Sequence, residues 1–211
     1  MNVIAINGSP KKEGNTYHAL KIVLDELEKA GISGEVIHIG NKNIRGCLAC
    51  GSCAKNKDEK CIQSKDNVNE WIARMKDADG ILLGSPVYYA DLAGTMKAFL
   101  DRAFYVSGAN GNLFRHKVGA SVVAVRRSGG LPAFHSLNNY LLYSEMFIPA
   151  SNYWNVIHGA RPGEAMQDEE GIQIMKVLGQ NMAWLMKLVA QGKDNVPAPE
   201  KEKKRYMNFV R

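Results

Sequence analysis

Four cysteines have the residue type and the spacing that point most directly to chemistry. Cys47, Cys50 and Cys53 are separated by two residues each, and Cys61 follows after a gap of seven. Because a compact turn brings such thiolates together, they can converge on one metal centre, and four thiolates match the ligand set of a [4Fe–4S] cluster. All four are local, so they cannot link distant segments as a disulfide scaffold does.

Other interpretations of the cysteine segment stay open. Its spacing is not the bacterial ferredoxin run, which ends with a three-residue gap and Cys-Pro, because Ile62 follows Cys61 here. Zinc also takes four thiolates, although its paired ligands usually lie further apart. A dithiol–disulfide pair needs only two of the four, and the thiols can also be without function. Lys55, Lys57 and Lys60 would partly offset the charge of a cluster.

A second candidate site is the turn between the first apolar run, residues 3–6, and the helical pattern that follows. Free N–H groups at a helix N-terminus suit a phosphate, and the glycines of this turn permit close approach. The Walker A and dinucleotide motifs are excluded, because Asn15 replaces the required lysine and Pro10 the second glycine. The alternative is an ordinary turn with Thr16 as helix cap. The short hydrogen-bonding side chains here are those of Ser9, Asn15 and Thr16.

The elements that position these segments follow from the apolar pattern. Strand-like runs alternate with amphipathic helical segments, which predicts parallel strands joined by right-handed crossovers. Five strands fit an α/β fold with the flavodoxin-like doubly wound order 2-1-3-4-5 and helices on both faces. We predict one domain over residues 1–190, with a Cys-rich loop insertion at 47–61, and a basic C-terminal arm over 191–211. The predicted strands are residues 3–6, 35–39, 80–84, 118–125 and 153–157, and helices start near 16, 66, 93, 132 and 169.

Two further loops lie where ligands bind in such a sheet, beyond the carboxyl ends of its strands. The loop after the third strand carries Tyr88 and Tyr89, which would form a platform or edge for a planar ring; alternatively, one is core and the other ordinary surface. The loop after the fourth strand runs from Arg126 to Gly130. Its glycine pair lets backbone amides approach a ligand. Its arginines would contact a phosphate of a nicotinamide cofactor or face water.

Taken together, these segments resemble the FMN-binding, NAD(P)H-dependent reductases of the flavodoxin-like superfamily. The resemblance covers about residues 1–190, and only the combination of motifs is specific. With the cysteines added, the chain is most similar to the iron–sulfur flavoprotein branch. Its last cysteine gap, of seven residues, is near the long end of the lengths typical of that branch. The segments that carry the resemblance are residues 8–16, 84–88 and 96–102.

The resemblance implies a role for each loop. FMN itself would carry the redox chemistry, while the protein binds and orients it. No acid–base residue is therefore assigned, and the candidates nearest the chemistry are Tyr88, Tyr89 and Arg127. The implied phosphate ligands are Ser9, Lys12, Asn15 and Thr16. The implied ribityl and ring contacts are Ser85, Pro86, Val87, Tyr88 and Tyr89. The implied pyrimidine-edge residues are Arg127, Ser128, Gly129 and Gly130, and the implied metal ligands are Cys47, Cys50, Cys53 and Cys61.

We therefore predict an FMN-dependent oxidoreductase. It would pass electrons from NAD(P)H or a reduced carrier such as ferredoxin to a small acceptor such as a quinone, dye, metal ion or oxygen species. The alternatives are a flavodoxin-like electron carrier and an FMN reductase whose cysteines carry no cluster. The net charge of +6 argues against a carrier, since those of the family are typically acidic. Only the basic tail suggests nucleic-acid binding, which we do not expect.

The composition indicates a globular protein, and it bears on the expected location. A hydrophobic fraction of 45% with 23% charged residues is ordinary for a globular protein with a core. No apolar run is long enough for a membrane helix and the N-terminus lacks the pattern of a signal peptide, so we expect no membrane partner and a cytoplasmic location. The resemblance implies a homodimer or a dimer of dimers.

Overall fold

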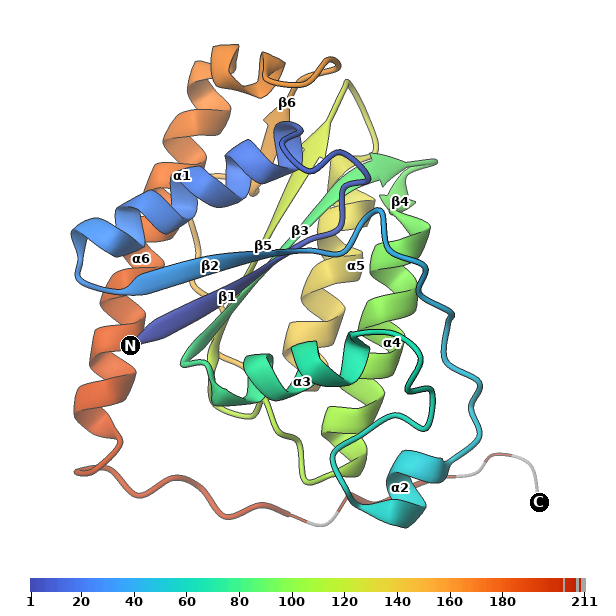
Figure 1. Cartoon of the computed structure of the whole chain (residues 1–211). Coiled ribbons are helices and arrows are strands. Elements are labelled where there is room, and N and C mark those ends of the chain that lie inside the picture. Colours follow the sequence, from blue (N-terminus) through green and yellow to red (C-terminus); the bar gives the residue numbers. More distant parts are fainter. Residues whose placement is uncertain (203, 208, 210–211) are drawn as a thin grey trace.

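A parallel sheet with helices on both faces forms the body of the protein (Figure 1). The structure, a computed structural model, describes residues 1–202, 204–207 and 209. In chain order the elements are β1 (Asn2–Asn7), α1 (Asn15–Lys29), β2 (Ser33–His38), α2 (Ser52–Asn56), α3 (Val68–Asp77), β3 (Gly80–Tyr88), β4 (Asp91–Leu92), α4 (Gly94–Ala109), β5 (Val118–Val125), α5 (Gly130–Tyr143), β6 (Val156–His158), the 3-10 helix η1 (Glu164–Gln167) and α6 (Glu169–Gly192).

The parallel strands lie in the order β2-β1-β3-β5-β6, which confirms the predicted doubly wound α/β architecture. In the register of the central strands, Ala5 lies between Val36 and Leu82. The predicted count of five strands was wrong, because the short strand β4 pairs antiparallel with the end of β3 and makes a sixth. Strand β3 therefore continues through Tyr88, over residues predicted as a loop.

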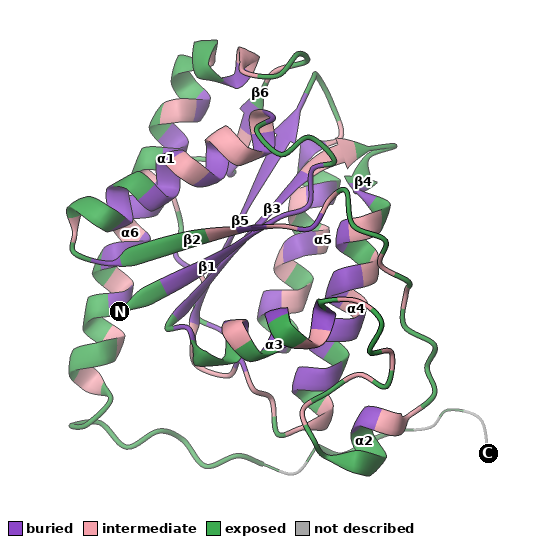
Figure 2. Cartoon of the chain, in the orientation of Figure 1, coloured by how far each residue is buried: buried purple, intermediate pink, exposed green. Residues whose placement is uncertain are grey.

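Successive side chains of each strand point to opposite faces of the sheet, so the core forms two layers, one on each face. Val3 and Ala5 of β1 pack against α1 and α6, whereas Ile4 and Ile6 pack against α3, α4 and α5. All eight residues of β5 are buried, as expected for a central parallel strand. Figure 2 shows the buried residues concentrated in β1, β3 and β5 and on the inner faces of the helices. This packing fixes the carboxyl ends of the strands, where the candidate loops begin.

Several element boundaries differ from the predictions. Helix α5 begins at Gly130, before Pro132, because the first turn of a helix tolerates proline, whose missing N–H would have no partner there. Strand β6 begins only at Val156, so Tyr153 and Trp154 precede it as an edge-to-face pair with ring centroids 4.4 Å apart. The cysteine segment, predicted as a loop, contains the short helix α2.

The predicted C-terminal arm runs in an extended conformation along the lower side of the molecule in Figure 1. Arg115 donates a hydrogen bond to the carbonyl of Pro199 at 3.2 Å. Lys204 donates to the hydroxyl of Tyr143 at 2.6 Å and lies 4.1 Å from the centre of its ring. Arm positions 203, 208, 210 and 211 lie outside the described residues. Within the described chain, no helix is both long and apolar enough to cross a membrane.

Candidate functional site

The turn between β1 and α1 is held by side chains that sequence reasoning did not single out as site residues. Asn7 is fully buried at the end of β1; its Oδ1 accepts a hydrogen bond from the Ser9 amide and its Nδ2 donates to the Lys12 carbonyl, both at 3.0 Å. His38, at the end of β2, donates from Nε2 to the Ser9 carbonyl at 2.7 Å. A Cβ on Gly40 would lie 1.9 Å from that carbonyl oxygen, so only glycine fits there. The turn is therefore rigidly shaped before any ligand binds.

The hydroxyl of Thr16 is the feature of this turn that best fits a bound anion. Helix α1 begins at Asn15 with Gly14 as its N-cap, so the alternative in which Thr16 caps the helix is wrong. Thr16 is 1% exposed, and its Oγ1 has no hydrogen-bond partner in the described part of the chain. A buried unpaired hydroxyl costs about 1–3 kcal/mol. Together with the free N–H groups of the first helical turn, it fits a bound phosphate group.

The other implied phosphate ligands have different surroundings. Ser9 is buried, and its Oγ accepts a hydrogen bond from the Lys11 amide at 3.2 Å. Asn15 Oδ1 accepts one from the Ala165 amide at 3.2 Å, which ties the helix start to η1. Lys12 is exposed. These three residues therefore lie in the same turn as Thr16, and two of them also stabilise its conformation.

The β3–β4 hairpin holds the two tyrosines in a strained turn. Tyr88 pairs with Asp91, and the turn residues Tyr89 and Ala90 have φ values of 49° and 62°. Positive φ at both central positions defines a type I′ turn, which favours asparagine and glycine. Tyr89 is fully exposed and Tyr88 about half exposed. Backbone strain of this kind is typical of ligand-binding segments.

The remaining residues of this segment divide into two groups. Ser85 is buried, and its Oγ donates to the Pro86 carbonyl at 2.8 Å and accepts from the Ala93 amide at 3.1 Å. It therefore fixes the entry into α4. Pro86 and Val87 are partly exposed at the end of β3, on the way to the tyrosines.

The strain in the hairpin gives a testable prediction for Ala90→Gly. Because glycine adopts positive φ without a steric penalty, we expect the free energy of unfolding of the flavin-free protein to rise by about 1 kcal/mol. Urea denaturation measures it. Ala98→Gly, inside α4, is the matched control and should lower the same quantity by about 1 kcal/mol. Equal destabilisation by both variants would refute strain at this turn.

The loop after β5 meets this hairpin. Gly129, with a φ of 87°, is the N-cap of α5, and a Cβ there would lie 2.9 Å from the Cα of Ala90. A Cβ on Gly130 would lie 2.9 Å from a side-chain carbon of Val156. Both positions therefore need glycine, while Arg127 and Ser128 are exposed at the tip of the loop. The loops after β3 and β5 thus share one edge, as the sequence predicts.

A pocket of about 380 Å³ adjoins this loop on the β6 side, within the usual size range of small-molecule sites. Sequence reasoning assigned no pocket here, because its walls come from segments far apart in the chain. Its lining includes the predicted residues Arg127, Ser128, Gly129 and Gly130. The remaining lining is aromatic, apolar and charged: Val125, Leu131, Pro132, Tyr153, Trp154, Val156, His158, Asp168, Glu170, Gly171 and Ile174.

Asp168 connects the wall of this pocket to the start of α6. It accepts hydrogen bonds from the Gly171 amide at 2.9 Å, the His158 amide at 2.7 Å and His158 Nδ1 at 3.2 Å. Burial alone would raise the pKa of Asp168, but these hydrogen bonds outweigh it and hold the pKa below its ordinary value. The carboxylate therefore stabilises the fold above about pH 4, and this contribution is lost as the pH falls through the lowered pKa.

We expect Asp168→Ala to lower the free energy of unfolding by about 1 kcal/mol at pH 7, because it removes a helix cap and its charge. The deficit should shrink as the pH falls below about 4, because the carboxylate of the unfolded chain is protonated there first and that of the folded protein only at its lowered pKa. Asp168→Asn keeps an acceptor for the cap and should show a smaller deficit at pH 7. Denaturant titrations at pH 7 and pH 3 measure both, and a deficit that grows at pH 3 would contradict this assignment.

The four predicted metal ligands line one small cavity of about 20 Å³, on the opposite side of the molecule from the loops after β1, β3 and β5. Cys53 is buried and Cys61 half-buried, whereas Cys47 and Cys50 are exposed. Ser52 lowers the pKa of the Cys50 thiol by hydrogen bonding, and burial raises the pKa of Cys53. Asn69 of α3 holds the backbone of Cys61 with hydrogen bonds of 2.8 and 2.9 Å.

The arrangement of these thiols bears on the choice of metal. Among the described residues, no three His, Cys, Asp or Glu side chains are grouped to hold a metal ion. Zinc binds its thiolates about 2.3 Å from a single ion. A four-iron cluster binds each thiolate to a different iron, so its ligands surround a volume. The four cysteines that line this cavity match the number of thiolates that either kind of centre takes.

The two candidate sites lie at different ends of α4. Gly8 lies in the turn between β1 and α1, which we call the phosphate turn after the group that the resemblance implies for it. A Cβ on Gly8 would lie 2.8 Å from Met96, in the first turns of α4. The cysteine cavity contacts Tyr105 and Val106, near its other end. At 1.5 Å per residue, the separation along the helix is roughly 15 Å. Figure 1 likewise shows α2 far from the phosphate turn and the β3–β4 hairpin.

A doubly wound parallel sheet with loops at the carboxyl ends of β1, β3 and β5 defines a flavodoxin-like fold. A solved flavodoxin from an archaeon superposes with a TM-score of 0.58 at 17% identity, covering 89% of this chain and 99% of that one. An NAD(P)H:quinone oxidoreductase from Methanothermobacter marburgensis gives 0.65 at 18% identity, covering 86% and 96%.

Sequence comparison then narrows the class to a family. Residues 1–161 match the model of NADPH-dependent FMN reductase. An iron–sulfur flavoprotein of Methanocaldococcus jannaschii is 33% identical over 196 residues, covering 90% of this chain and 99% of the relative. The chain belongs to the NADPH-dependent FMN reductase family, in its iron–sulfur flavoprotein branch. The resemblance stated from the sequence is confirmed, and the protein is an FMN-containing oxidoreductase.

Proposed function

We propose that the protein passes electrons from NAD(P)H or a reduced carrier, through FMN, to a small acceptor such as a quinone. The observation that carries the proposal is the buried hydroxyl of Thr16 at the start of α1, which has no hydrogen-bond partner among the residues that the structure describes and lies on the same sheet edge as the loops after β3 and β5. FMN, when bound, supplies the chemistry of accepting and donating electrons singly or as hydride. The protein supplies the site that binds and orients it.

Each loop has a part in this proposal. Thr16 and the free amides of α1 bind the phosphate, with Ser9, Lys12 and Asn15 around them. The end of β3 and the strained hairpin line the ribityl chain and the ring. The loop after β5 borders the pyrimidine edge through Arg127, Ser128 and the amides of Gly129 and Gly130. The pocket of about 380 Å³ beside that loop is where a planar acceptor or nicotinamide would approach the ring.

The names of similar proteins support the choice of donor and acceptor. The structure that superposes from M. marburgensis is named an NAD(P)H:quinone oxidoreductase. A Bacillus protein that is 29% identical over 139 residues is named an NADPH azoreductase. Quinones and azo dyes are both planar and conjugated, which suits a site beside an exposed flavin ring.

We also propose that the four cysteines hold a [4Fe–4S] cluster. Cys47, Cys50, Cys53 and Cys61 would be its ligands, one thiolate to each iron, in the cavity they share. The cluster, when bound, supplies single-electron transfer. The resemblance to iron–sulfur flavoproteins implies that a cluster can lie near the flavin of a neighbouring subunit. This favours a homodimer or a dimer of dimers as the working assembly.

The experiment that tests the proposed activity is NAD(P)H oxidation by the FMN-loaded chain. Rapid oxidation in the presence of a small quinone or dye, with little without acceptor, is the expected result. If the flavin-loaded protein reacts with neither NADH nor NADPH, the proposed NAD(P)H-dependent activity is wrong, and a flavodoxin-like electron carrier is favoured instead. Light scattering on the same sample tests the assembly, for which a monomer with full flavin activity is the contradicting result.

A further inference from the structure

Arg102 is a buried arginine on the apolar side of α4. Its side chain is 0% exposed, and it follows Phe99 by one helical turn on the face that packs into the core. Burying a guanidinium is expensive unless it is paired and hydrogen-bonded. Such a residue in a core helix therefore has a specific task, and none of the loops described above explains it.

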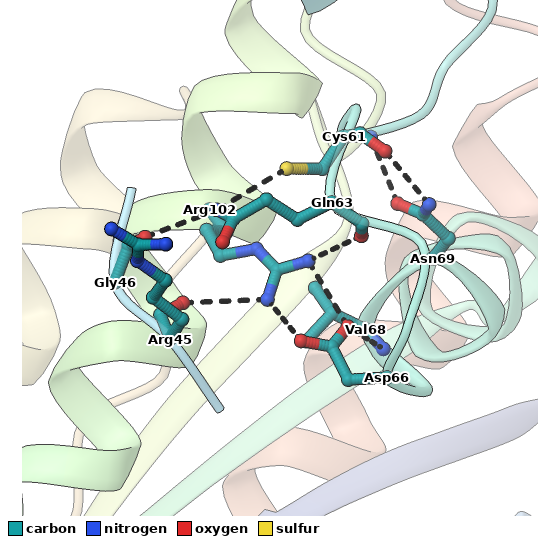
Figure 3. Close-up of polar contacts among 8 residues, drawn as sticks. All are labelled: Arg45, Gly46, Cys61, Gln63, Asp66, Val68, Asn69 and Arg102. Carbon is teal, nitrogen blue, oxygen red and sulfur yellow. Dashed lines mark hydrogen bonds and ion pairs between the residues drawn. The ribbon is translucent and has the colours of Figure 1, made fainter. Parts of the chain in front are cut away.

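The hydrogen bonds of Arg102 join the two ends of the cysteine segment (Figure 3). Nη1 donates to the Arg45 carbonyl at 3.3 Å, two residues before the first cysteine. Nη2 donates to the Gln63 carbonyl at 2.8 Å, two residues after the last. Both nitrogens also contact the Asp66 carboxylate, at 2.5 and 3.0 Å. A planar fork of donors can make these bonds together, whereas a lysine cannot.

The side chain of Gln63 also joins the two ends of the cysteine segment, as Arg102 does. Gln63 Nε2 donates to the Gly46 carbonyl at 3.0 Å and lies 3.9 Å from Cys61 Sγ. Figure 3 shows Gln63 between Gly46 and Cys61, beside the guanidinium. Gly46, immediately before Cys47, and Gln63, two residues after Cys61, are thus hydrogen-bonded to each other, and Arg102 joins the same two ends of the segment to α4. Fixing both ends reduces the conformations open to the thiols between them.

One donor of Arg102 is left over. Its Nε has no hydrogen-bond partner within the described residues, although the side chain lines the cavity that all four cysteines share. The guanidinium of an arginine is always protonated in proteins, and this one is paired with the Asp66 carboxylate. A buried N–H that has no acceptor among the described residues and lies beside thiols would suit an anionic sulfur as its acceptor.

We propose that Arg102 is a positioning residue of the cluster site: its Nη atoms close the cysteine segment, and its Nε–H is the donor to a sulfur of the bound cluster. The inference rests on the cluster assigned under the proposed function. A fixed positive charge beside the cluster stabilises the reduced form, which is one charge more negative than the oxidised form. Arg102 therefore raises the reduction potential in addition to organising the ligands.

The test is anaerobic reconstitution of the full-length, FMN-loaded chain with iron and sulfide, in wild type, Arg102→Gln, Arg102→Lys and Arg45→Gln. Arg45→Gln is the matched control, because it removes a neighbouring exposed arginine side chain but keeps the backbone carbonyl that Arg102 contacts. The readouts are iron and sulfide per chain, the cluster absorption and electron spin resonance spectra, and the reduction potential. FMN content reports whether each variant is folded.

We expect wild type and Arg45→Gln to bind the same amount of iron at the same potential. Arg102→Gln should bind less iron, and at a fixed potential its reduced-to-oxidised ratio should fall about tenfold, a shift of about 59 mV. Arg102→Lys keeps the charge without the fork, so it should lose iron but shift the potential less. Asp66→Asn, which weakens the clamp and keeps the arginine, is the second variant if Arg102→Gln fails to bind FMN; it should also lose iron.

Three outcomes would overturn the inference. Unchanged iron content and potential in Arg102→Gln would refute the role of Arg102 and leave the cluster in place. Unchanged iron in Asp66→Asn would refute the clamp. A folded wild type that takes up no iron would overturn the cluster and this inference together, which distinguishes the failure of the proposed function from the failure of the role of Arg102 alone.

Discussion

Thr16→Val is expected to weaken FMN binding by roughly 10- to 150-fold while leaving the flavin-free protein at least as stable as wild type. A hydrogen bond to a charged group contributes about 1.5–3 kcal/mol, which sets the size of the effect. Valine has nearly the shape of threonine and removes a buried hydroxyl that has no partner in the described chain. Fluorescence titration with FMN and urea denaturation measure the two quantities.

Thr16→Ser gives the opposite pattern and serves as the control. It keeps the hydroxyl but loses a buried methyl group, so it should bind FMN nearly as wild type does while unfolding about 1 kcal/mol more easily. Equal FMN affinity in Thr16→Val and wild type would show that this hydroxyl does not contact the phosphate.

Cys53→Ala is expected to reduce the iron content of the anaerobic protein from about four per chain to near zero. Cys53 is the buried member of the four cysteines that share the cavity, so a solvent ligand cannot easily replace it. FMN binding should be unaffected, because the phosphate turn lies roughly 15 Å away along α4. Colorimetric iron and sulfide assays beside a flavin assay measure both.

Lys55→Ala, on the same short helix and exposed, is the matched control for the cysteine variant and should retain its iron. If Cys53→Ala keeps a full complement of iron with an unchanged spectrum, the buried thiol is not a ligand. The assignment of all four cysteines to one cluster would then be wrong.

Much of the fold could be predicted because apolar runs and helical stripes alternate along this chain. The last residues of β3 could not be predicted as strand, because a proline such as Pro86 is unfavourable inside a strand. In the structure β1 ends beside Gly84, so β3 continues past it with only β5 as a parallel neighbour. A proline is tolerated at such a position, since its missing N–H leaves no ladder bond on the open side unmade.

The residues of the candidate sites likewise fall into those that the sequence predicted and those that it did not. The phosphate turn and the glycine loop were predictable because their residues are close in sequence. Arg102 was quoted within a motif but received no role, because its partners Arg45 and Asp66 lie 57 and 36 residues away. A charged residue among the apolar positions of α4 was the available signal. Asn7, a polar residue at the end of an apolar strand, was a similar one.

The most direct test of the central claim is to purify the chain without oxygen and to measure FMN, iron and sulfide on the same sample. We predict about one FMN per chain, with about four irons and four sulfides. Flavin without iron would confine the error to the cysteine site. A colourless protein that releases no flavin and does not bind added FMN would contradict the account as a whole.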